Sequence, residues 1–322
     1  MSSTATVRES AETARDFLQR LERNIESLVL GKDEAVRMVL VALLAGEHVL
    51  LEDVPGVGKT LLAKALAKSF DGVFARIQFT PDLLPSDIVG SSIYNSKSGD
   101  FTFAPGPVFA NVLLADEVNR APPRTQSALL ECMSEHQVSI DGQPHPVPRP
   151  FLVIATQNPF EFEGTYLLPE SQLDRFLLRI EIGYPSRQFE RNILLTHNEG
   201  EPVDNLQPVV SLQEVSAAQS IVRHVRVEDS VLNYLQDIVE ATRKSPELTV
   251  GVSTRGMLGF YRASQALAVV NGRDFVTPDD VKRLAVPLIA HRVMPRGQAA
   301  GADRRAAESL IRKLIDSLRA PA

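Results

Sequence analysis

The sequence predicts an α/β fold with a five-stranded parallel sheet, followed by a smaller domain built of helices. Short apolar segments alternate with helix-like stretches over the first 185 residues, the pattern of a parallel sheet covered on both faces. Beyond residue 185 the apolar spacing is helical, with no strong strand. A length of 322 residues also suits two domains of about 150 residues each. We therefore expect an α/β domain at 1–185 and a helical domain at 186–322.

The first domain is expected to begin with two helices and to continue with five strands. Apolar residues recur at helical spacing from Phe17 to Leu28, and again over 33–44. The dipeptide Leu30-Gly31 separates the two helices. The short apolar segments with strand character cover 48–51, 73–78, 112–116, 151–156 and 177–182.

Two β-hairpins are expected to interrupt this alternation. Residues 91–103 have the pattern of a hairpin that turns at Ser98-Gly99-Asp100. Residues 138–143 have the pattern of a second hairpin, with an Asp-Gly turn at 141–142. Because such hairpins stand outside an α/β core, we interpret them as effector loops, with a decorative surface role as the alternative.

The second domain is expected to contain six helices. They cover 187–197, 212–222, 228–242, 254–270, 277–290 and 304–318. Four of the starts carry residues that favour helix caps, namely Ser211, Ser253, Thr277 and Asp303.

Composition excludes several classes of protein. The net charge of −6 argues against a general nucleic-acid binder. The longest apolar run, 39–45, is far shorter than a membrane span, and the first ten residues carry no apolar secretion signal. The single cysteine, Cys132, has no partner within the chain, which is typical of a cytoplasmic protein. We therefore expect a soluble cytoplasmic protein without membrane insertion.

Residues 49–60, VLLEDVPGVGKT, form the most informative segment. A strand leads into a glycine turn, Lys-Thr follows, and a helix pattern begins, which is the arrangement of a P-loop. The glycines let backbone N–H groups turn toward nucleotide phosphates, and the helix N-terminus adds its positive end. Lys59 is expected to reach the β- and γ-phosphates and Thr60 to bind Mg²⁺. Asp53 replaces the first glycine of the pattern. The residues expected to contact the nucleotide here are Pro55, Gly56, Val57, Gly58, Lys59, Thr60 and Leu61.

Two further strand ends carry polar side chains suited to phosphate chemistry. Asp116-Glu117 ends an apolar strand about 56 residues after the P-loop. Asp116 is expected to hold Mg²⁺ through its water shell, and Glu117 to orient and polarise the attacking water. Asn158 follows the next strand, where its amide could hold that water or a γ-phosphate oxygen.

Three arginines are candidates for contact with the phosphates. Arg175 precedes the last expected strand and Arg179 lies within it. Arg255 lies in the first turn of a helix of the second domain, where the helix dipole disfavours a cation and a bound anion would explain it. Taken singly, each of them also suits a surface ion pair.

Taken in order, these motifs resemble the AAA+ ATPases and, more narrowly, the MoxR family. The narrower resemblance is carried by LEDVPGVGKT at 51–60, LADEVNRA at 114–121, ATQNP at 155–159 and LPESQLDRF at 168–176. Asp53 belongs to this pattern, and the resemblance covers nearly the whole chain. It implies a P-loop core with strand order 5-1-4-3-2 and a helical lid. The hairpins stand where this clade carries its helix-2 insert and its pre-sensor-1 hairpin.

The resemblance also assigns roles to residues. It places Leu30 and Gly31 on the adenine side, makes Asn158 sensor 1 and Arg255 sensor 2, and adds Asp116 to the nucleotide-binding residues. The catalytic residues that it implies are Lys59, Glu117, Asn158, Arg175 and Arg255.

Family membership further implies a ring of identical subunits, usually a hexamer, with ATP and Mg²⁺ bound between subunits. Arg175 would be the arginine finger that reaches the neighbouring site, with Arg179 and Arg120 as open alternatives. MoxR proteins are chaperone-like ATPases thought to remodel or activate client proteins, often with a von Willebrand factor A domain protein as partner. We expect the same of this chain.

Other functions compete with this interpretation. A motor subunit of the magnesium-chelatase type has a similar ATPase half, and the residues do not separate the two. A DNA motor of the same clade would use both hairpins on nucleic acid. The hairpins offer little positive charge to phosphates, however. The first carries Lys97 beside Asp100, and the second carries His136 and His145 but no lysine or arginine. A nucleotide-gated switch with poor hydrolysis conflicts with the intact Glu117. A small P-loop kinase conflicts with the chain length and the helical lid.

Overall fold

The computed structural model describes residues 16–97, 99–158, 165–196, 202–297 and 304–321. Its centre is a parallel sheet with strand order β2-β5-β8-β1-β9. The strands are β1 (Val49–Glu52), β2 (Phe74–Gln78), β5 (Val112–Asp116), β8 (Leu152–Gln157) and β9 (Leu178–Ile180). Each lies within two residues of the expected bounds. Counted along the chain, the five strands have the order 5-1-4-3-2, so the predicted α/β core is confirmed.

Helices cover both faces of this sheet. Val49 and Leu51 pack in one apolar cluster with α2 (Asp33–Ala45) and α3 (Lys59–Ser69). Leu50 packs in a second cluster with α5 (Pro123–Glu135). Because side chains alternate across a strand, α2 and α3 lie on one face and α5 on the other. A helix over 16–26 adds to the first cluster, as the N-terminal periodicity predicts.

Cys132 lies in α5 and is fully buried in the second cluster. Burial raises the pKa of its thiol to about 12. The thiol donates a hydrogen bond to the carbonyl of Leu129, one turn earlier.

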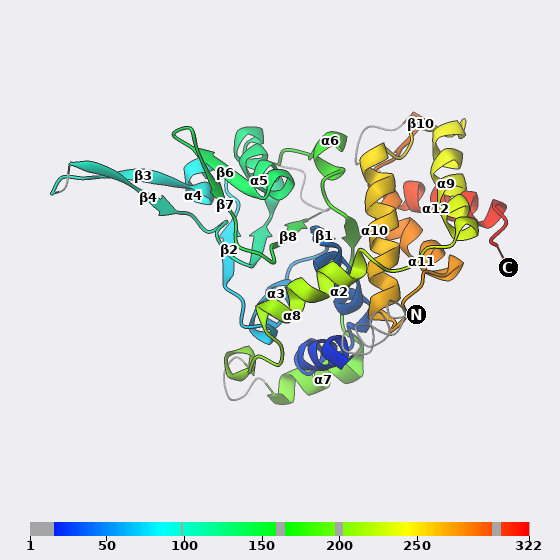
Figure 1. The fold of residues 1–322 in the computed structure, drawn as a ribbon, viewed down its shortest axis with the longest axis horizontal. Coiled ribbons are helices and arrows are strands. Elements are labelled where there is room, and N and C mark those ends of the chain that lie inside the picture. Colours follow the sequence, from blue (N-terminus) through cyan, green and yellow to red (C-terminus); the bar gives the residue numbers. More distant parts are fainter. Residues whose placement is uncertain (1–15, 98, 159–164, 197–201, 298–303, 322) are drawn as a thin grey trace, which may run out of the picture.

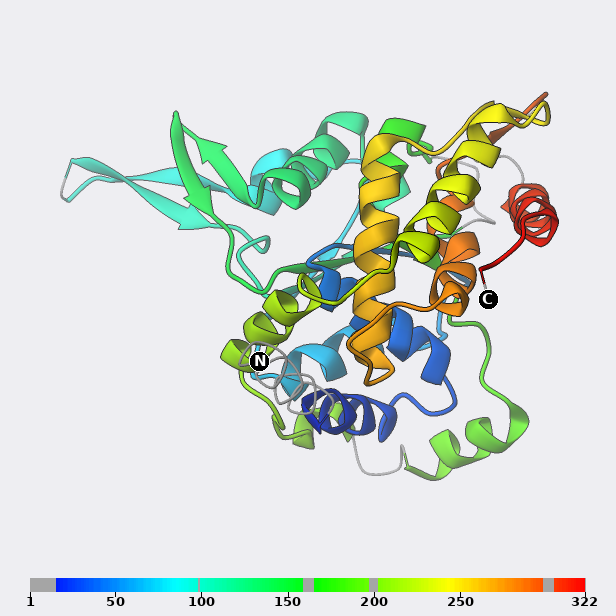
Figure 2. The same ribbon diagram turned by 45° about the vertical axis from the view of Figure 1, so that its right-hand side comes forward.

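The two expected hairpins are present and project together from the α/β core. They consist of β3 (Gly90–Asn95) with β4 (Asp100–Pro105), and β6 (Gln137–Ile140) with β7 (Gln143–Pro146). Figures 1 and 2 show them on the side of the core opposite α9, α11 and α12. The Asp-Gly turn at 141–142 is confirmed, with positive φ at both residues. Asp100 is corrected from turn to strand because it pairs with Asn95, and Ser98 lies outside the described residues.

Helices also fill the second half of the chain. They are α7 (Arg187–Thr196), α8 (Leu212–Val222), α9 (Asp229–Lys244), α10 (Thr254–Val270), α11 (Pro278–Ile289) and α12 (Arg304–Ser317). The long helix α10 packs against α2 and α11, which joins this half to the core (Figure 2). A short antiparallel pair, β10 (Leu248–Val250) with β11 (Met294–Pro295), adds to the expected helices. A domain boundary at residue 185 stays a prediction.

The expected caps of this half are largely present. Ser211 and Ser253 accept hydrogen bonds from backbone N–H groups of α8 and α10, and Thr277 forms a capping box with Asp280. Asp303 lies outside the described residues. Short helices α4 (Pro85–Val89) and α6 (Glu170–Leu173) complete the core. In the described part of the chain, every helix is too short or too polar to cross a membrane.

Candidate active site

The carboxyl ends of the central strands gather the predicted phosphate-binding elements at one edge of the sheet. Glu52 pairs with Gln157 across β1 and β8, and Ala115 pairs with Ala155 across β5 and β8. The backbone N–H of Asp53 lies 3.3 Å from the carbonyl oxygen of Gln157. The P-loop after β1, the carboxylates after β5 and the amide after β8 are therefore neighbours, where ligands bind in open α/β sheets.

The P-loop has the backbone shape that phosphate binding needs. Gly56 and Gly58 have φ of 82° and 96°, a conformation that favours glycine. A Cβ at either position would meet nothing within 4 Å, so both face open space. Gly58 is also the N-cap residue directly before α3, and the free N–H groups of the first turn of α3 point out of the helix end. The loop thus offers a cradle of the kind that holds phosphate oxygens.

Lys59 spans this cradle. Its ammonium donates a hydrogen bond of 3.1 Å to the carbonyl of Asp53, at the opposite end of the loop. Val57 is buried and anchors the loop on the core, whereas Pro55 and Gly56 are exposed. Thr60 follows in the first turn of α3 and is half-buried. A phosphate in the loop would therefore lie beside a cation and a hydroxyl.

Asp53 explains the departure from the glycine pattern. It is buried, and its carboxylate accepts hydrogen bonds of 2.6 Å from the backbone N–H groups of both Ile182 and Gly183. Its other oxygen accepts from the N–H of Val54 at 2.9 Å. Lys32 closes the network by donating to the carbonyls of residues 182 and 183. The carboxylate thus ties the start of the P-loop to the chain that leaves β9, a bond that glycine could not make.

Asp116 and Glu117 are held by side chains from neighbouring strands. Asp116 accepts from the hydroxyl of Thr156 at 2.6 Å and pairs with Arg76 at 2.5 Å. The N–H of Glu117 donates to the same Thr156 hydroxyl at 2.9 Å. Glu117 adopts φ 58° and ψ 50°, a left-handed conformation rare outside glycine and found where function demands it.

The carboxylate of Glu117 is also fixed in direction. The amide of Gln78 donates to it at 2.7 Å, and the guanidinium of Arg120 lies 3.0 Å away. The Glu117 side chain is about one-quarter exposed, so water reaches it. It is therefore a partly exposed carboxylate at the same sheet edge as the P-loop, with β8 between its own strand and β1.

Sequence reasoning missed three of these supporting residues: Arg76, Gln78 and Thr156. Arg76 and Gln78 alternate with apolar residues along β2, and Gln78 pairs with Asp116 in the strand register. That alternation on an edge strand was the available signal. Thr156 is fully buried within an apolar strand, so its sequence context resembles the core.

The ligand chemistry of this edge suits a nucleotide with Mg²⁺. Among the described residues, His, Cys, Asp and Glu side chains form no group of three or more placed to hold a metal. One carboxylate, Asp116, and one hydroxyl, Thr60, are the oxygen ligands that the sequence predicts for this edge. Mg²⁺ is usually bound by one or two protein oxygens together with phosphates and waters, so this donor set fits it.

The other predicted residues are placed as follows. Asn158 is buried directly after β8, at the same sheet edge. Gly31 has φ 68°, and a Cβ there would lie 2.3 Å from the ring of Phe189, so only glycine fits beside this ring. Leu30 is half-buried next to it. Arg255 is exposed in the first turn of α10, and its charge acts on buried Arg292 and on Glu47.

The three finger candidates occupy different environments. Arg175 donates to the carbonyl of Leu130 and, at 2.8 Å, to the hydroxyl of Ser134, at the end of α5. Arg179 is buried and lies 3.6 Å from the carboxylate of Glu52. Arg120 lies against Glu117 of its own subunit. Because Arg179 is shielded from any neighbouring molecule, its burial favours Arg175 over it.

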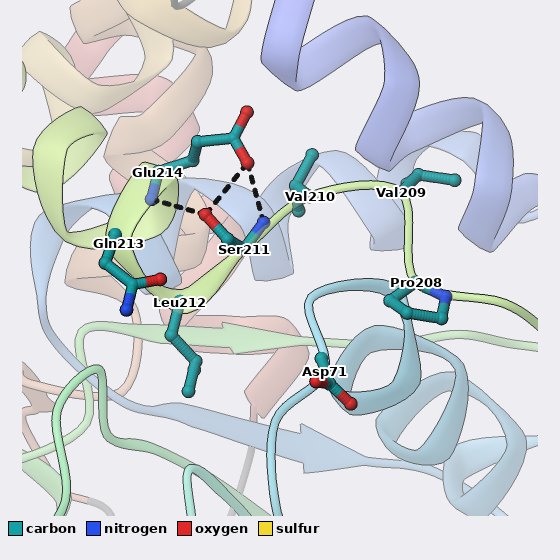
Figure 3. A pocket seen from close by; sticks show the side chains of 8 residues that line it. All are labelled: Asp71, Pro208, Val209, Val210, Ser211, Leu212, Gln213 and Glu214. Carbon is teal, nitrogen blue, oxygen red and sulfur yellow. Dashed lines mark hydrogen bonds between the residues drawn. The ribbon is translucent and has the colours of Figure 1, made fainter.

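Cavities are also present outside the carboxyl ends of the strands. One, of about 440 Å³, lies at the start of α8 (Figure 3). Its most conspicuous polar groups, Ser211 and Glu214, are hydrogen-bonded to each other as the capping box of α8. A second, of about 670 Å³, is lined mostly by charged side chains and borders Gly31.

Comparison with known proteins gives consistent findings. Residues 48–178 match the ATPase family associated with various cellular activities, and residues 240–314 match the AAA lid domain. The chain is 45% identical to the Bacillus subtilis protein YeaC over 96% of this chain and 97% of that one. It is 43% identical to Chaperone MoxR1 of Mycobacterium tuberculosis over 94% of this chain and 82% of that one. The fold also matches the crystal structure of a Cytophaga hutchinsonii protein described as an ATPase. The TM-score is 0.89 and the sequence identity 35%, over the full length of both chains.

Proposed function

Since this chain belongs to the MoxR family of AAA+ ATPases and is an ATP hydrolase, we propose a function that follows from this membership. The protein couples ATP hydrolysis to remodelling or activation of a client protein. The observation that supports the mechanism is the meeting of the P-loop, Asp116-Glu117 and Asn158 at one sheet edge. The relative named Chaperone MoxR1 supports the choice of a protein client.

In this proposal each residue of the site has one task. The loop N–H groups from Pro55 to Leu61 and the ammonium of Lys59 bind the phosphates. Thr60 and Asp116 would hold Mg²⁺, which would neutralise phosphate charge when bound. Leu30 and Gly31 lie on the adenine side, and Asn158 positions the attacking water or a γ-phosphate oxygen.

Glu117 is the residue that activates water. Its left-handed backbone and its contacts with Gln78 and Arg120 keep the carboxylate in one direction before substrate arrives. A preorganised carboxylate orients the water and needs little rearrangement during the reaction. Phosphoryl transfer depends mainly on such positioning and on charge stabilisation.

The charge that develops on the phosphate is stabilised by arginines. Arg255 acts from the lid of the same subunit, and Arg175 acts on the site of the next subunit. This assignment makes the protein a ring, most simply a hexamer.

A von Willebrand factor A domain protein is the proposed partner, and the single cysteine suits a cytoplasmic location.

The hairpins support a protein client over a nucleic acid. The large apolar side chains of Ile93, Tyr94 and Phe101 on the first hairpin are all more than half exposed. Such a surface suits contact with a polypeptide, whereas nucleic acid requires cations for its phosphates. A magnesium-chelatase-type motor remains the second candidate, since it would keep the same site.

Two substitutions test the ATPase site. Lys59→Ala should weaken binding of a fluorescent ATP analogue, because the loop loses its cation. Glu117→Gln should bind ATP normally yet hydrolyse it at least about 100-fold more slowly, because the amide keeps the shape and loses the charge that polarises water. Lys64→Ala, on the same helix, and Glu131→Gln, exposed on α5, are the matched controls. Near wild-type turnover in Glu117→Gln would remove Glu117 from the catalytic role.

A further inference from the structure

We infer that an ion pair between the buried Arg292 and the half-buried Asp174 sets the position of Arg175 and links it to the lid of its own subunit. The inference rests on the proposed function, in which Arg175 serves the neighbouring active site. Asp174 and Arg292 would be positioning residues, since neither touches the nucleotide.

Arg292 holds the backbone on both sides of Arg175. It follows α11, and its side chain is 3% exposed. Nε donates to the Asp174 carboxylate at 2.9 Å and Nη1 donates to the carbonyl of Leu177 at 2.9 Å. Nη2 donates to the carbonyls of Asp174, at 3.3 Å, and of Phe176. One side chain thus fixes the segment 174–177, whose second residue is Arg175.

The cost of burying this charge points to a geometric role. Burial lowers the pKa of Arg292 to about 10, and the group stays charged at neutral pH. Buried ion pairs often stabilise a fold no better than packed apolar residues of the same size. A guanidinium does offer what an apolar side chain lacks, several donors in a fixed planar fork. The fork here donates to three backbone carbonyls, those of Asp174, Phe176 and Leu177, on both sides of Arg175.

Asp174 also holds the start of the helix that carries Arg255. The hydroxyl of Ser253 donates to the Asp174 carboxylate at 2.9 Å and accepts from the N–H of Gly256 as the N-cap of α10. A Cβ at Gly256 would lie 2.9 Å from Cδ of Arg292, so glycine permits this close approach. Two parts of the lid, the start of α10 and the residue after α11, therefore meet at one carboxylate.

Arg175 lies between this cluster and α5. Its guanidinium contacts the last turn of α5, while its backbone neighbours are held by Arg292. A shift of the lid, such as closure around a nucleotide, would move the backbone of Arg175 against α5. The position of the lid in one subunit would then control the position of the Arg175 that this subunit presents to the active site of the next.

Mixed rings separate this effect from the other roles of the lid. A Lys59→Ala subunit is inactive at its own site and can only donate Arg175, whereas an Arg175→Ala subunit can only accept it. Mixing the two should restore ATPase activity. Adding Arg292→Met to the Lys59→Ala donor should lower the restored activity about 10- to 100-fold, the scale of an ångström-sized misplacement. The half-saturating ATP concentration, set by the unchanged acceptor, should stay the same.

The outcomes are distinguishable. An inactive baseline mixture, with mixed rings shown by co-purification of two tags, would overturn the trans-acting Arg175 and the inference with it. The other outcome is an active baseline mixture whose ATPase activity changes less than twofold when the donor also carries Arg292→Met. That result would overturn the inference but leave the trans-acting Arg175 intact.

Controls address folding. Arg273→Met in the donor breaks another arginine–carboxylate pair of the lid, with Asp280, and should leave the restored activity unchanged. If Arg292→Met fails to fold, Ser253→Ala removes one arm of the cluster without leaving a buried charge. That variant in the donor should lower activity in the same direction, and an unchanged activity would overturn the inference. Arg292→Lys keeps the charge but loses the planar fork of donors. Compared with Arg292→Met, it should therefore fold better but give little more restored ATPase activity.

Discussion

His48 shows how a single buried side chain makes stability depend on pH. It precedes β1, and both ring nitrogens are used: Nδ1 accepts from the N–H of Val153 at 3.0 Å, and Nε2 lies 3.1 Å from the carbonyl of Met133. Only the neutral ring with hydrogen on Nε2 satisfies both contacts, since a second ring proton would face the N–H of Val153. Burial accordingly lowers the pKa of His48 to about 4.

We predict that this histidine destabilises the fold in acid. The unfolded chain takes up the proton near pH 6.5, before the folded protein does, so this contribution is complete above pH 6.5 and is lost as the pH falls toward 4. The pKa difference corresponds to a loss of about 3 kcal/mol in unfolding free energy. Urea unfolding at pH 7 and pH 4.5 measures most of this loss, which is complete only below pH 4. His48→Gln should flatten the dependence, and exposed His224→Gln should not. An equal pH slope in wild type and His48→Gln would contradict the prediction.

At the level of residues, the sequence pointed to the groups proposed to bind the nucleotide, whereas the residues that hold those groups in place became visible only in the fold. The motifs that contain Lys59, Asp116 and Glu117 have a spacing that predicts the role of each residue. Arg76 and Thr156 act through contacts between strands distant in sequence, which the chain order does not display. Asp53 could be noted as a departure, but its partners after β9 required the fold.

Among the helices, α8 depends on a capping box at its start. Ser211 accepts from the N–H of Glu214 at 3.2 Å, and Glu214 accepts in return from the N–H of Ser211 at 2.7 Å. Each bond satisfies a backbone donor that the helix end leaves unpaired. Glu214 also pairs with Arg20 at 2.9 Å, which joins α8 to the N-terminal helix.

Removing this cap should cost a measurable amount of stability. Ser211→Ala is expected to lower the unfolding free energy by about 1 kcal/mol, the usual worth of an N-cap side chain. Chemical unfolding at pH 7 checks the value. Ser216→Ala is the control in the same helix: its hydroxyl only donates back to Leu212, and alanine is the better helix former, so no loss is expected. A loss in the control as large as in Ser211→Ala would show that the cap is not the cause.

Most elements could be predicted because their apolar period is strong, and the core strands and long helices match closely. The β10–β11 pair was missed because each strand has only two or three residues, too few to show a period of two. Asp100 was assigned to a turn because Gly-Asp favours turns, yet pairing with Asn95 decides its place.

The whole molecule places its possible contact surfaces far apart. The hairpins project at one end of the molecule, and α9, α11 and α12 lie at the other (Figure 1). The P-loop edge lies in the sheet between them. In the proposed ring, a subunit of this shape would offer different surfaces to its two neighbours, which is the kind of contact that closes into rings.

Ring assembly should appear in the concentration dependence of activity. If Arg175 completes the neighbouring site, ATPase activity per subunit should rise with protein concentration, because arginine fingers contribute roughly 10³–10⁵ in rate. Steady-state assays across the assembly range, with sedimentation in parallel, measure both quantities. Arg175→Ala should assemble equally while its activity stays low. Constant activity per subunit while rings form would contradict the proposal.

The burial of Cys132 has a practical consequence for such experiments. Thiolates are the reactive form of cysteine, and burial raises the pKa of Cys132 to about 12, so its thiol stays protonated at neutral pH. The sequence contains no other cysteine. A fluorophore carried by a maleimide should therefore ignore the native chain and modify a single cysteine introduced at an exposed site such as Phe101. The fold thus permits site-specific labelling, and with it distance measurements between hairpin and lid during turnover, without first removing a native thiol.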